Sequence, residues 1–310
     1  MAMRIAVVGA GAMGSLFGGK LSAGAEVTLL DPWAEHVAAM QRDGLRITEL
    51  DGGETIIPVT ATADSSAVPG VDLVIIFVKA HATRQASQWA SDFLASDGLA
   101  LTLQNGVGNA ETMAEVLGAE RVVAGVTSHG ATLLGPGRVR HAGKGPTHIA
   151  ARPEIAEKLA DVATVFEQAG FEVHLSADLD SLVWGKLIIN VGINALTGIL
   201  RVPNGQLVEI PAASELMAQA VAEAVAVCQA KGVALPYDDP LGRVQEVARA
   251  TATNRASMLQ DVLRGVPTEI GVINEAIVRE GKRLGVFTPV NGFIVTTIRA
   301  IEGSYAVRVS

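Results

Sequence analysis

Apolar and polar residues alternate in blocks along the first half of the chain, and the blocks have the lengths of strands and helices. The run LVIIFV inside 71–79 is almost uninterrupted, which is typical of a strand covered on both faces. A helical pattern at 14–24 ends at a glycine, a common helix stop. Further strands of the same kind are expected at 4–10, 26–31, 99–106 and 122–127. Strands that alternate with helices predict βαβ units and a doubly wound parallel sheet.

The pattern changes in the second half of the chain. Glycine turns and alternation predict a β-hairpin region at 130–150, and one more helix and strand follow at 154–174. Beyond residue 180 the strand signals nearly stop, which predicts an all-helical domain. Its helices are expected at 181–200, 212–232, 239–263, 268–285 and 289–302. The segment SADLDS supplies helix-capping residues, so we place two domains at 1–177 and 178–310.

The composition narrows the classes of protein to consider. A chain of 310 residues that is 49% hydrophobic can bury two cores, and its net charge of −8 argues against nucleic acid or an anionic membrane surface as the main partner. The single cysteine, Cys228, excludes an internal disulfide and fits a reducing compartment. The uninterrupted apolar runs are shorter than the roughly 20 residues of a membrane span. We therefore expect a cytoplasmic protein without a membrane partner.

The segment GAGAMG follows the first predicted strand and precedes the first predicted helix. Its residues are Gly9, Ala10, Gly11, Ala12, Met13 and Gly14. In this G-x-G-x-x-G pattern the first glycine allows a tight turn, and the second lets backbone N–H groups approach a pyrophosphate. The third permits close packing of helix on strand. The pattern predicts a dinucleotide site at a helix N-terminus, although a glycine turn of another α/β protein is the alternative.

Asp31 ends the second predicted strand, 22 residues after Gly9. A carboxylate at this place can accept hydrogen bonds from the hydroxyls of the adenosine ribose and would repel a 2′-phosphate. No Arg or Lys lies between Asp31 and Gln41 to offset that repulsion. The sequence therefore favours NAD(H) over NADP(H). The alternative is a loop carboxylate or a cap for the next helix.

Lys186, Asn190 and Asn194 are spaced four residues apart in an otherwise apolar helical stretch. Residues at this spacing share one face of a helix, and asparagine is costly to bury without a partner. A desolvated lysine has a lowered pKa and can donate a proton to a developing alkoxide. The row therefore favours a functional site over a purely structural helix. Lys186 alone would equally fit a lysine that reaches solvent from the end of a helix.

The chain resembles the ketopantoate reductase (2-dehydropantoate 2-reductase) family over nearly its whole length. The resemblance rests on GAGAMG, on VKA at 78–80, on LQNGVGN at 103–109, and on two long segments. These segments are KLIINVGINALTGILRVPNGQL at 186–207 and NRASMLQDVLRGVPTEIGVINEAIV at 254–278. The resemblance implies a Rossmann domain, an all-helical domain and hydride transfer from a nicotinamide to the ketone of a branched 2-oxo acid. The product would be D-pantoate, in pantothenate biosynthesis.

The resemblance also implies roles for individual residues. Lys186 takes the place of the catalytic lysine, and Glu269 that of a glutamate that binds substrate and assists the lysine in catalysis. Lys79 takes the place of a lysine near the cofactor, and Asn105 is expected to contact the cofactor as well. The carboxamides and hydroxyl that would bind substrate are Asn105 from the Rossmann side, Asn190, Asn194, Asn254 and Ser257. Asn254 and Ser257 are three apart, which would put them on one helical face.

Several of these roles have structural alternatives. Glu269 follows Pro267 and Thr268 and would also fit a solvated carboxylate at a helix start. Asn254 and Ser257 could be structural, and Lys79 could be an ordinary surface lysine. The family usually prefers NADPH and places a basic or amide residue where this chain has Asp31, so NADP(H) remains an alternative cofactor.

Two other functions stay open at the level of sequence. One is a reductase or dehydrogenase of a different 2-oxo or hydroxy acid on the same scaffold, and the other is a non-catalytic NAD(H)-binding sensor. No histidine spacing suggests a metal ligand set, so we expect no metal. The Ala-rich helix at 212–232 could pack within a monomer or across a homodimer.

Overall fold

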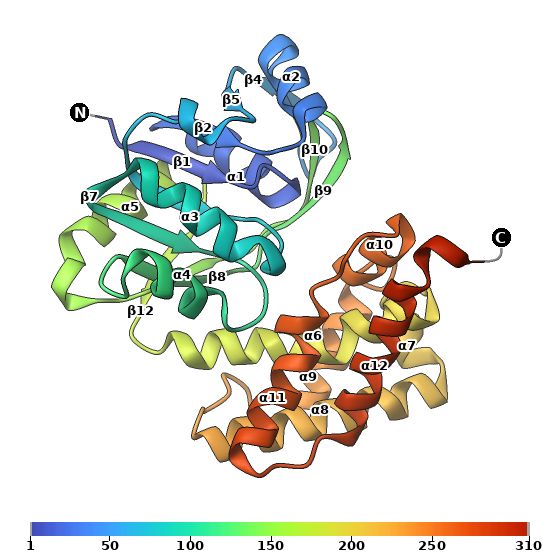
Figure 1. The fold of residues 1–310 in the computed structure, drawn as a ribbon. Helices are drawn as coiled ribbons and strands as arrows, with labels where there is room; N and C mark the ends of the chain where they lie inside the picture. The colour runs from blue at the N-terminus through green and yellow to red at the C-terminus, as the bar shows by residue number, and fades with distance from the viewer. Residues whose placement is uncertain (1, 309–310) are drawn as a thin grey trace. The chain divides into compact units, whose positions relative to one another are not determined.

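The computed structural model describes residues 2–308, which form two compact units (Figure 1). The first contains residues up to Gln104 together with Asn109–Leu179. The second contains Asn105–Gly108 and the residues from Asp180 onward. Asn105, which the sequence analysis assigned to the Rossmann side, therefore belongs by its contacts to the second unit.

The first unit is built on a mostly parallel sheet of eight strands in the order β12-β11-β8-β7-β6-β1-β2-β5. Only the pairing of β11 with β8 is antiparallel among its neighbours. The strands are β1 (Arg4–Val8), β2 (Glu26–Leu30), β5 (Thr60–Thr62), β6 (Val71–Ile76), β7 (Leu94–Thr102), β8 (Val122–Thr127), β11 (Thr147–Ala150) and β12 (Val173–Ser176). The order from β5 to β8 is that of a Rossmann sheet, with its switch point between β1 and β6.

Both faces of this sheet are buried, as its apolar strands predicted. Ile5 and Val7 of β1 lie in a core with residues of α1 and α5, whereas Ala6 and Val8 lie in a core with residues of α3 and α4. Alternate residues of one strand thus enter different cores. The helices of this unit are α1 (Ala12–Leu21), α2 (Ala34–Asp43), α3 (Thr83–Phe93), α4 (Asn109–Leu117) and α5 (Ala156–Gln168). The predicted doubly wound fold is confirmed.

A second sheet in this unit has the order β4-β3-β10-β9. Its strands are β3 (Leu45–Thr48), β4 (Glu54–Ile57), β9 (Gly130–Gly135) and β10 (Arg138–Gly143). The antiparallel pair β9 and β10 confirms the predicted hairpin. Strands β3, β4 and β5 were not predicted. They are only three or four residues long, and β4 is largely exposed, so their apolar patterns are too short to stand out.

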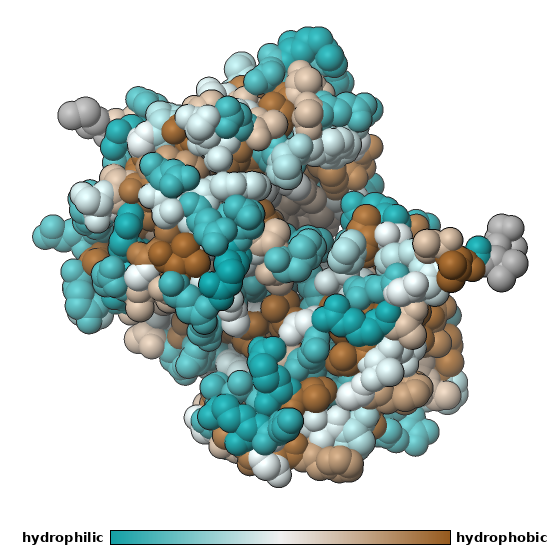
Figure 2. Space-filling model, viewed as in Figure 1, coloured by the Kyte–Doolittle hydropathy of each residue, from teal (hydrophilic) through white to brown (hydrophobic). Residues whose placement is uncertain are grey.

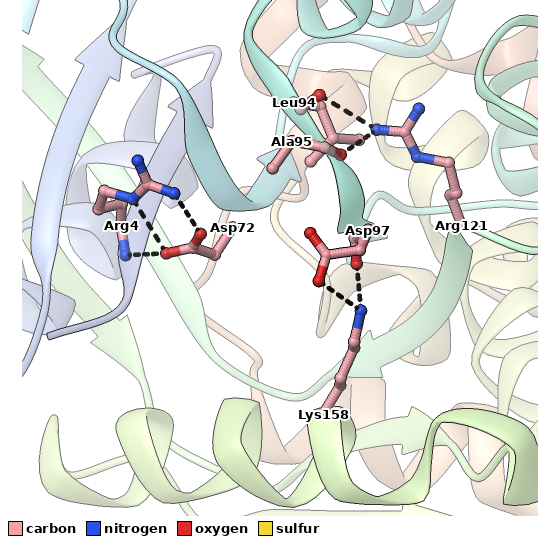
Figure 3. A network of polar contacts seen from close by, with 7 residues as sticks. All are labelled: Arg4, Asp72, Leu94, Ala95, Asp97, Arg121 and Lys158. Atoms are coloured by element: carbon pink, nitrogen blue, oxygen red, sulfur yellow. Dashed lines mark hydrogen bonds and ion pairs between the residues drawn. The ribbon is translucent and has the colours of Figure 1, made fainter. Parts of the chain in front are cut away.

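Polar contacts tie together the edge of the main sheet where β1 and β6 begin (Figure 3). Asp72 of β6 accepts a hydrogen bond from the Arg4 backbone N–H (3.0 Å) and pairs with the Arg4 guanidinium (2.5 Å). The guanidinium of Arg121 donates to the carbonyls of Leu94 and Ala95 at 3.2 and 2.6 Å. Lys158 of α5 binds Asp97 within β7. These contacts hold the edge opposite the carboxyl ends of β1 and β6.

The second unit is helical. Its helices are α6 (Leu179–Leu200), α7 (Gln206–Glu209), α8 (Pro211–Lys231), α9 (Pro240–Ala250), α10 (Ser257–Arg264), α11 (Asn274–Leu284) and α12 (Pro289–Gly303). Helix α6 supplies Trp184, Leu187, Ile188 and Val191 to one continuous core. By length and composition α6 could cross a membrane, yet 67% of its apolar window is buried inside the protein. The face in Figure 2 mixes hydrophilic and apolar groups. Phe287 and Phe293 of this unit are exposed.

Two of the predicted long helices are broken. The expected helix at 239–263 ends at Ala250 and resumes at Ser257. Between them the carbonyls of Ala252 and Asn254 accept hydrogen bonds from the N–H groups of Gly205 (3.1 Å) and Asn204 (3.0 Å). The intervening residues therefore bind another loop instead of continuing the helix.

The expected helix at 268–285 begins only at Asn274, after a 3₁₀ turn at Ile270–Val272. The carbonyl of Val272 accepts a hydrogen bond from the N–H of Val107 at 3.1 Å. Val107 thus binds a carbonyl that would have accepted a hydrogen bond within a longer helix. It also attaches the segment Asn105–Gly108 to the helical unit.

Candidate functional site

The GAGAMG loop joins β1 to α1 at the switch point of the sheet. Gly9 has a φ of +93°, and a Cβ there would lie 2.6 Å from the backbone nitrogen of Val78. A Cβ on Gly14 would lie 1.9 Å from the carbonyl oxygen of Gly9, so helix and loop are in direct backbone contact. A Cβ on Gly11 would meet no protein atom within 4 Å. The first and third glycines are thus needed for packing, and the space beside the second is open.

The positive end of α1 is available to an anion. Gly11 is its N-cap residue, no side chain caps the helix, and its first turn holds no acidic residue. The backbone N–H groups of Ala12 and Met13 therefore belong to the set that a helix leaves without intrahelical partners. Together with the open space beside Gly11, this geometry fits the pyrophosphate of a dinucleotide.

His36 and Ser15 support the GAGAMG loop, and neither residue was predicted from the sequence. The carbonyl of Ala10 accepts a hydrogen bond from Ser15 Oγ (2.6 Å) and lies 2.8 Å from His36 Nε2. The N–H of Gly137 donates to His36 Nδ1 at 2.9 Å, so Nε2 carries the proton and donates to Ala10. Burial lowers the pKa of His36, which keeps the ring neutral in this arrangement. Sequence reasoning tested His36 only as a metal ligand, because nothing local to it reveals a contact with Ala10.

Asp31 follows β2 directly. Its Oδ1 accepts a hydrogen bond from the N–H of Trp33 at 2.9 Å, and its own N–H donates to the carbonyl of Thr62 at 3.1 Å. The first contact orders the turn into α2, which is the structural role that the sequence left open. It uses one carboxylate oxygen. Among residues 2–308 no hydrogen bond occupies Oδ2, so the acceptor and the charge proposed for the ribose are present.

Lys79 lies just after β6 and follows Val78, whose backbone packs closely against Gly9. Gln104 Nε2 donates to the carbonyl of Val78 at 2.6 Å and fixes this segment. The side chain of Lys79 is partly buried. Its position at the carboxyl end of β6 is compatible with a cofactor contact.

The second unit carries the other predicted residues. Lys186, Asn190 and Asn194 lie on α6 at the four-residue spacing of one helical face. Asn194 is 7% exposed, and its Nδ2 lies 3.5 Å from the hydroxyl oxygen of Ser257 at the start of α10. The structure thus brings Ser257 to the polar row of α6.

Lys186 and Glu269 interact electrostatically. Burial lowers the pKa of Lys186 to about 8, and the charge of Glu269 acts in the opposite direction. Glu269 is only 7% exposed and precedes the 3₁₀ turn at Ile270–Val272. It is therefore not the solvated helix-start carboxylate of the alternative interpretation. A partly buried amine with a pKa of about 8 beside a buried carboxylate is an arrangement suited to proton transfer.

Asn254 differs from the prediction. It lies in the non-helical segment between α9 and α10, and its side chain is exposed, so Asn254 and Ser257 do not share a helical face. Its backbone carbonyl binds the N–H of Asn204. Asn105 is partly buried and belongs to the segment that Val107 attaches to Val272. Of the four amides predicted to bind substrate, Asn105, Asn190 and Asn194 are at least partly buried in this structure, and Asn254 is not.

Residues 2–308 contain no group of three or more His, Cys, Asp or Glu side chains placed to hold a metal ion.

Comparison with known proteins covers both units. The family model described as ketopantoate reductase PanE/ApbA matches residues 5–154, and the model of the C-terminal part of that family matches residues 178–302. The 2-dehydropantoate 2-reductase of Halobacterium salinarum is 38% identical over 302 residues, which are 97% of this chain and 99% of the relative. The enzyme of the same name from Archaeoglobus fulgidus is 33% identical over 301 residues, covering 96% and 98% of the two chains.

Solved structures give the same architecture. A PanE/ApbA family ketopantoate reductase from Ralstonia eutropha superimposes with a TM-score of 0.90 at 37% identity, over 98% of this chain and 100% of the other. A D-mandelate dehydrogenase solved with NADH and anilino(oxo)acetate has a TM-score of 0.90 at 30% identity, again over 98% and 100%. The fold is thus common to proteins with different named substrates.

Proposed function

The chain belongs to the ketopantoate reductase family, and we propose that it reduces the ketone of a branched 2-oxo acid with NADH, converting ketopantoate to D-pantoate. As a member of the family it is an NAD(P)-dependent reductase. The observation that carries the proposed reaction is the electrostatic contact of Lys186 with the buried Glu269. Lys186 lies on the helix that also presents Asn190 and Asn194.

In this proposal the residues of the second unit bind and protonate the substrate. A bound nicotinamide cofactor supplies the hydride. Lys186 stabilises the negative charge that develops on the ketone oxygen and donates a proton from Nζ to it. Glu269 keeps the lysine protonated near neutral pH, since its charge raises the pKa that burial lowers. Asn194 and Ser257 supply an amide and a hydroxyl for the substrate carboxylate.

The preference for NADH rests on Asp31. Its free carboxylate oxygen can accept a hydrogen bond from a ribose hydroxyl, whereas its charge disfavours a 2′-phosphate. The D-mandelate dehydrogenase, which shares the fold, was solved with NADH. That relative also favours a second candidate, the reduction of a 2-oxo acid other than ketopantoate by the same residues.

The test is a matrix of steady-state measurements. Purified protein is assayed with ketopantoate and with a series of aliphatic and aromatic 2-oxo acids, each with NADH and with NADPH. We expect the largest kcat/KM for ketopantoate with NADH. A clearly higher kcat/KM for another 2-oxo acid would replace ketopantoate by the second candidate. Absence of turnover with every pair, despite NADH binding, would favour a non-catalytic sensor.

A further inference from the structure

A pocket of about 440 Å³ opens in the first unit, and none of the residues assigned to the reaction lines it. Its volume falls in the range of roughly 300–1,000 Å³ that is usual for small-molecule sites. Lys20 in the last turn of α1 lines it, whereas the GAGAMG segment ends in the first turn of that helix. Gly11, the N-cap of α1, and Lys20 are nine positions apart, about 13.5 Å along the helix axis. The lining also includes Glu49, Leu50, Asp51, His129, His141, Lys144 and Phe171.

Four of the lining side chains form one hydrogen-bonded chain. Lys20 Nζ binds Glu49 Oε1 at 2.6 Å, and Glu49 Oε2 lies 3.2 Å from His141 Nδ1. His141 Nε2 lies 3.0 Å from His129 Nδ1. We call these residues, Lys20, Glu49, His141 and His129, the Glu49 chain. They come from α1, from the end of β3, from β10 and from the loop before β9, so the fold assembles them from separate segments.

The direction of each hydrogen bond follows from the carboxylate. Burial raises the pKa of Glu49, but hydrogen bonds from Lys20 and His141 outweigh it, so the pKa is lowered and the group is ionised. An ionised Glu49 only accepts, so His141 donates from Nδ1 and, when neutral, has a lone pair on Nε2. His129 then donates from Nδ1 to that lone pair. Its own Nε2 is left as an acceptor.

His129 Nε2 is the feature that needs an explanation. The residue is 7% exposed, and Nε2 has no hydrogen-bond partner within residues 2–308. The rings of Phe171 and Phe17 meet the His129 ring edge-on, at centroid distances of 5.0 and 5.7 Å, and fix its orientation. Burial is the largest cause that lowers the pKa of His129 to about 4. The ring therefore stays neutral near pH 7 and keeps a buried acceptor, which is costly without a donor.

Lys144 supplies a positive charge at the same pocket. It follows β10 on the rim of the pocket, is exposed, and makes no ion pair within the described part of the chain. Lys20 is already engaged by Glu49, and Asp51 on the same rim accepts a hydrogen bond from the N–H of Gly53 (2.9 Å). Lys144 is thus the cation available to a ligand.

We propose that this pocket is a second small-molecule site, which binds an organic anion carrying a hydroxyl group. The hydroxyl donates to His129 Nε2, and the acid group pairs with Lys144. This site goes beyond the proposed reductase activity and does not depend on it. Its failure would leave that activity untouched.

The test uses two probes that differ by one hydroxyl, glycolate and acetate. Each is titrated into the full-length protein, and long-range ¹H–¹⁵N spectra follow the imidazole nitrogens of His129, assigned by comparison with His129→Asn. Asparagine keeps a donor near the position of Nδ1, and so the contact with His141, but has no atom at Nε2. The signal is local, so binding of either acid beside Lys186 does not imitate it.

We expect Nε2 of the free protein to be unprotonated, and glycolate to shift its signal with an affinity about fivefold above that of acetate, the effect of one hydrogen bond. His129→Asn should remove this difference. Lys144→Ala should weaken both probes, and Lys282→Ala, an exposed lysine of the second unit, should change neither. Since Lys144 is exposed, its variant tests the site even if His129→Asn fails to fold. Equal affinities in the unaltered protein, a protonated Nε2, or no shift with either probe would mean that only water fills the pocket, and would overturn the proposal.

Discussion

Lys186 gives the proposed reaction a defined pH dependence. Its pKa lies at about 8, and only the ammonium form can donate a proton. The rate of ketone reduction should therefore be highest below that value and fall as the pH rises through it. Steady-state kcat measured between pH 6 and 10 checks this. A rate that stays flat across pH 8 would remove Lys186 from the role of general acid.

Replacing Lys186 by alanine tests the same role more directly. The loss of a general acid costs about 10²–10⁴ in rate, so we expect a fall of kcat in that range. NADH binding, measured by fluorescence titration, should be unchanged, because the dinucleotide loop is in the other unit. Lys282→Ala is the matched lysine control. Full activity of Lys186→Ala on the best substrate would show that Lys186 is not the general acid.

Glu269 and burial shift the pKa of Lys186 in opposite directions. Its charge raises the pKa of Lys186, so Glu269→Gln should leave burial unopposed and lower that pKa. The alkaline loss of activity should then begin at a lower pH than in the unaltered protein. A pH profile of kcat measures the shift. If the profile kept its midpoint and only KM rose, Glu269 would act by binding the substrate alone.

Asp31 can be tested without disturbing its turn. Asp31→Asn keeps the oxygen that accepts from the Trp33 N–H but removes the charge. The ratio of kcat/KM for NADPH to that for NADH should rise by about tenfold or more, since a like-charge contact is relieved. An unchanged ratio, with the fold intact by circular dichroism, would assign Asp31 to the turn only.

At the scale of elements, the sequence predicted the helices and strands that have long apolar patterns. The strands around LVIIFV and the helix carrying Lys186 are long and strongly apolar, and each was found where its pattern placed it. It did not predict features decided by distant partners. Helix 239–263 is interrupted because Gly205 and Asn204 bind the carbonyls of Ala252 and Asn254, and no local pattern encodes those contacts. His36 was missed for the same reason, since its partner Ala10 is 26 residues away.

Two glycines at the junction of β1 and α1 are expected to have different roles, Gly14 in packing and Gly11 in ligand binding. Gly14→Ala would put a Cβ 1.9 Å from the Gly9 carbonyl oxygen, and overpacking of this kind costs about 1–3 kcal/mol. Gly11→Ala meets no protein atom, so it should leave stability nearly unchanged but weaken NADH binding by about tenfold, about 1.4 kcal/mol. Urea denaturation and fluorescence titration measure the two effects. Normal NADH affinity in Gly11→Ala would show that the pyrophosphate does not approach this glycine.

At the scale of the whole molecule, the two units are not consecutive pieces of chain. Asn105–Gly108 is flanked on both sides by segments of the first unit, yet it belongs to the second by its contacts. The sequence placed the division at a single point near residue 177 because the helical pattern starts there. A short segment without periodicity gives no sign that it joins the other core. Asn105 was therefore predicted as a binding residue but assigned to the wrong unit.

Gly106 packs the segment Asn105–Gly108 closely against Val272, so its substitution tests whether Asn105 binds the substrate. It has a φ of +81°, and a Cβ there would lie 2.2 Å from the Val272 carbonyl oxygen that binds Val107. Gly106→Ala should therefore cost at least about 1–2 kcal/mol from the left-handed backbone alone. It should also displace Asn105 and raise KM for the 2-oxo acid, with NADH affinity unchanged. Gly303→Ala, where a Cβ meets no atom within 4 Å, is the matched control. An unaltered KM in a protein destabilised as expected would show that Asn105 does not bind the substrate.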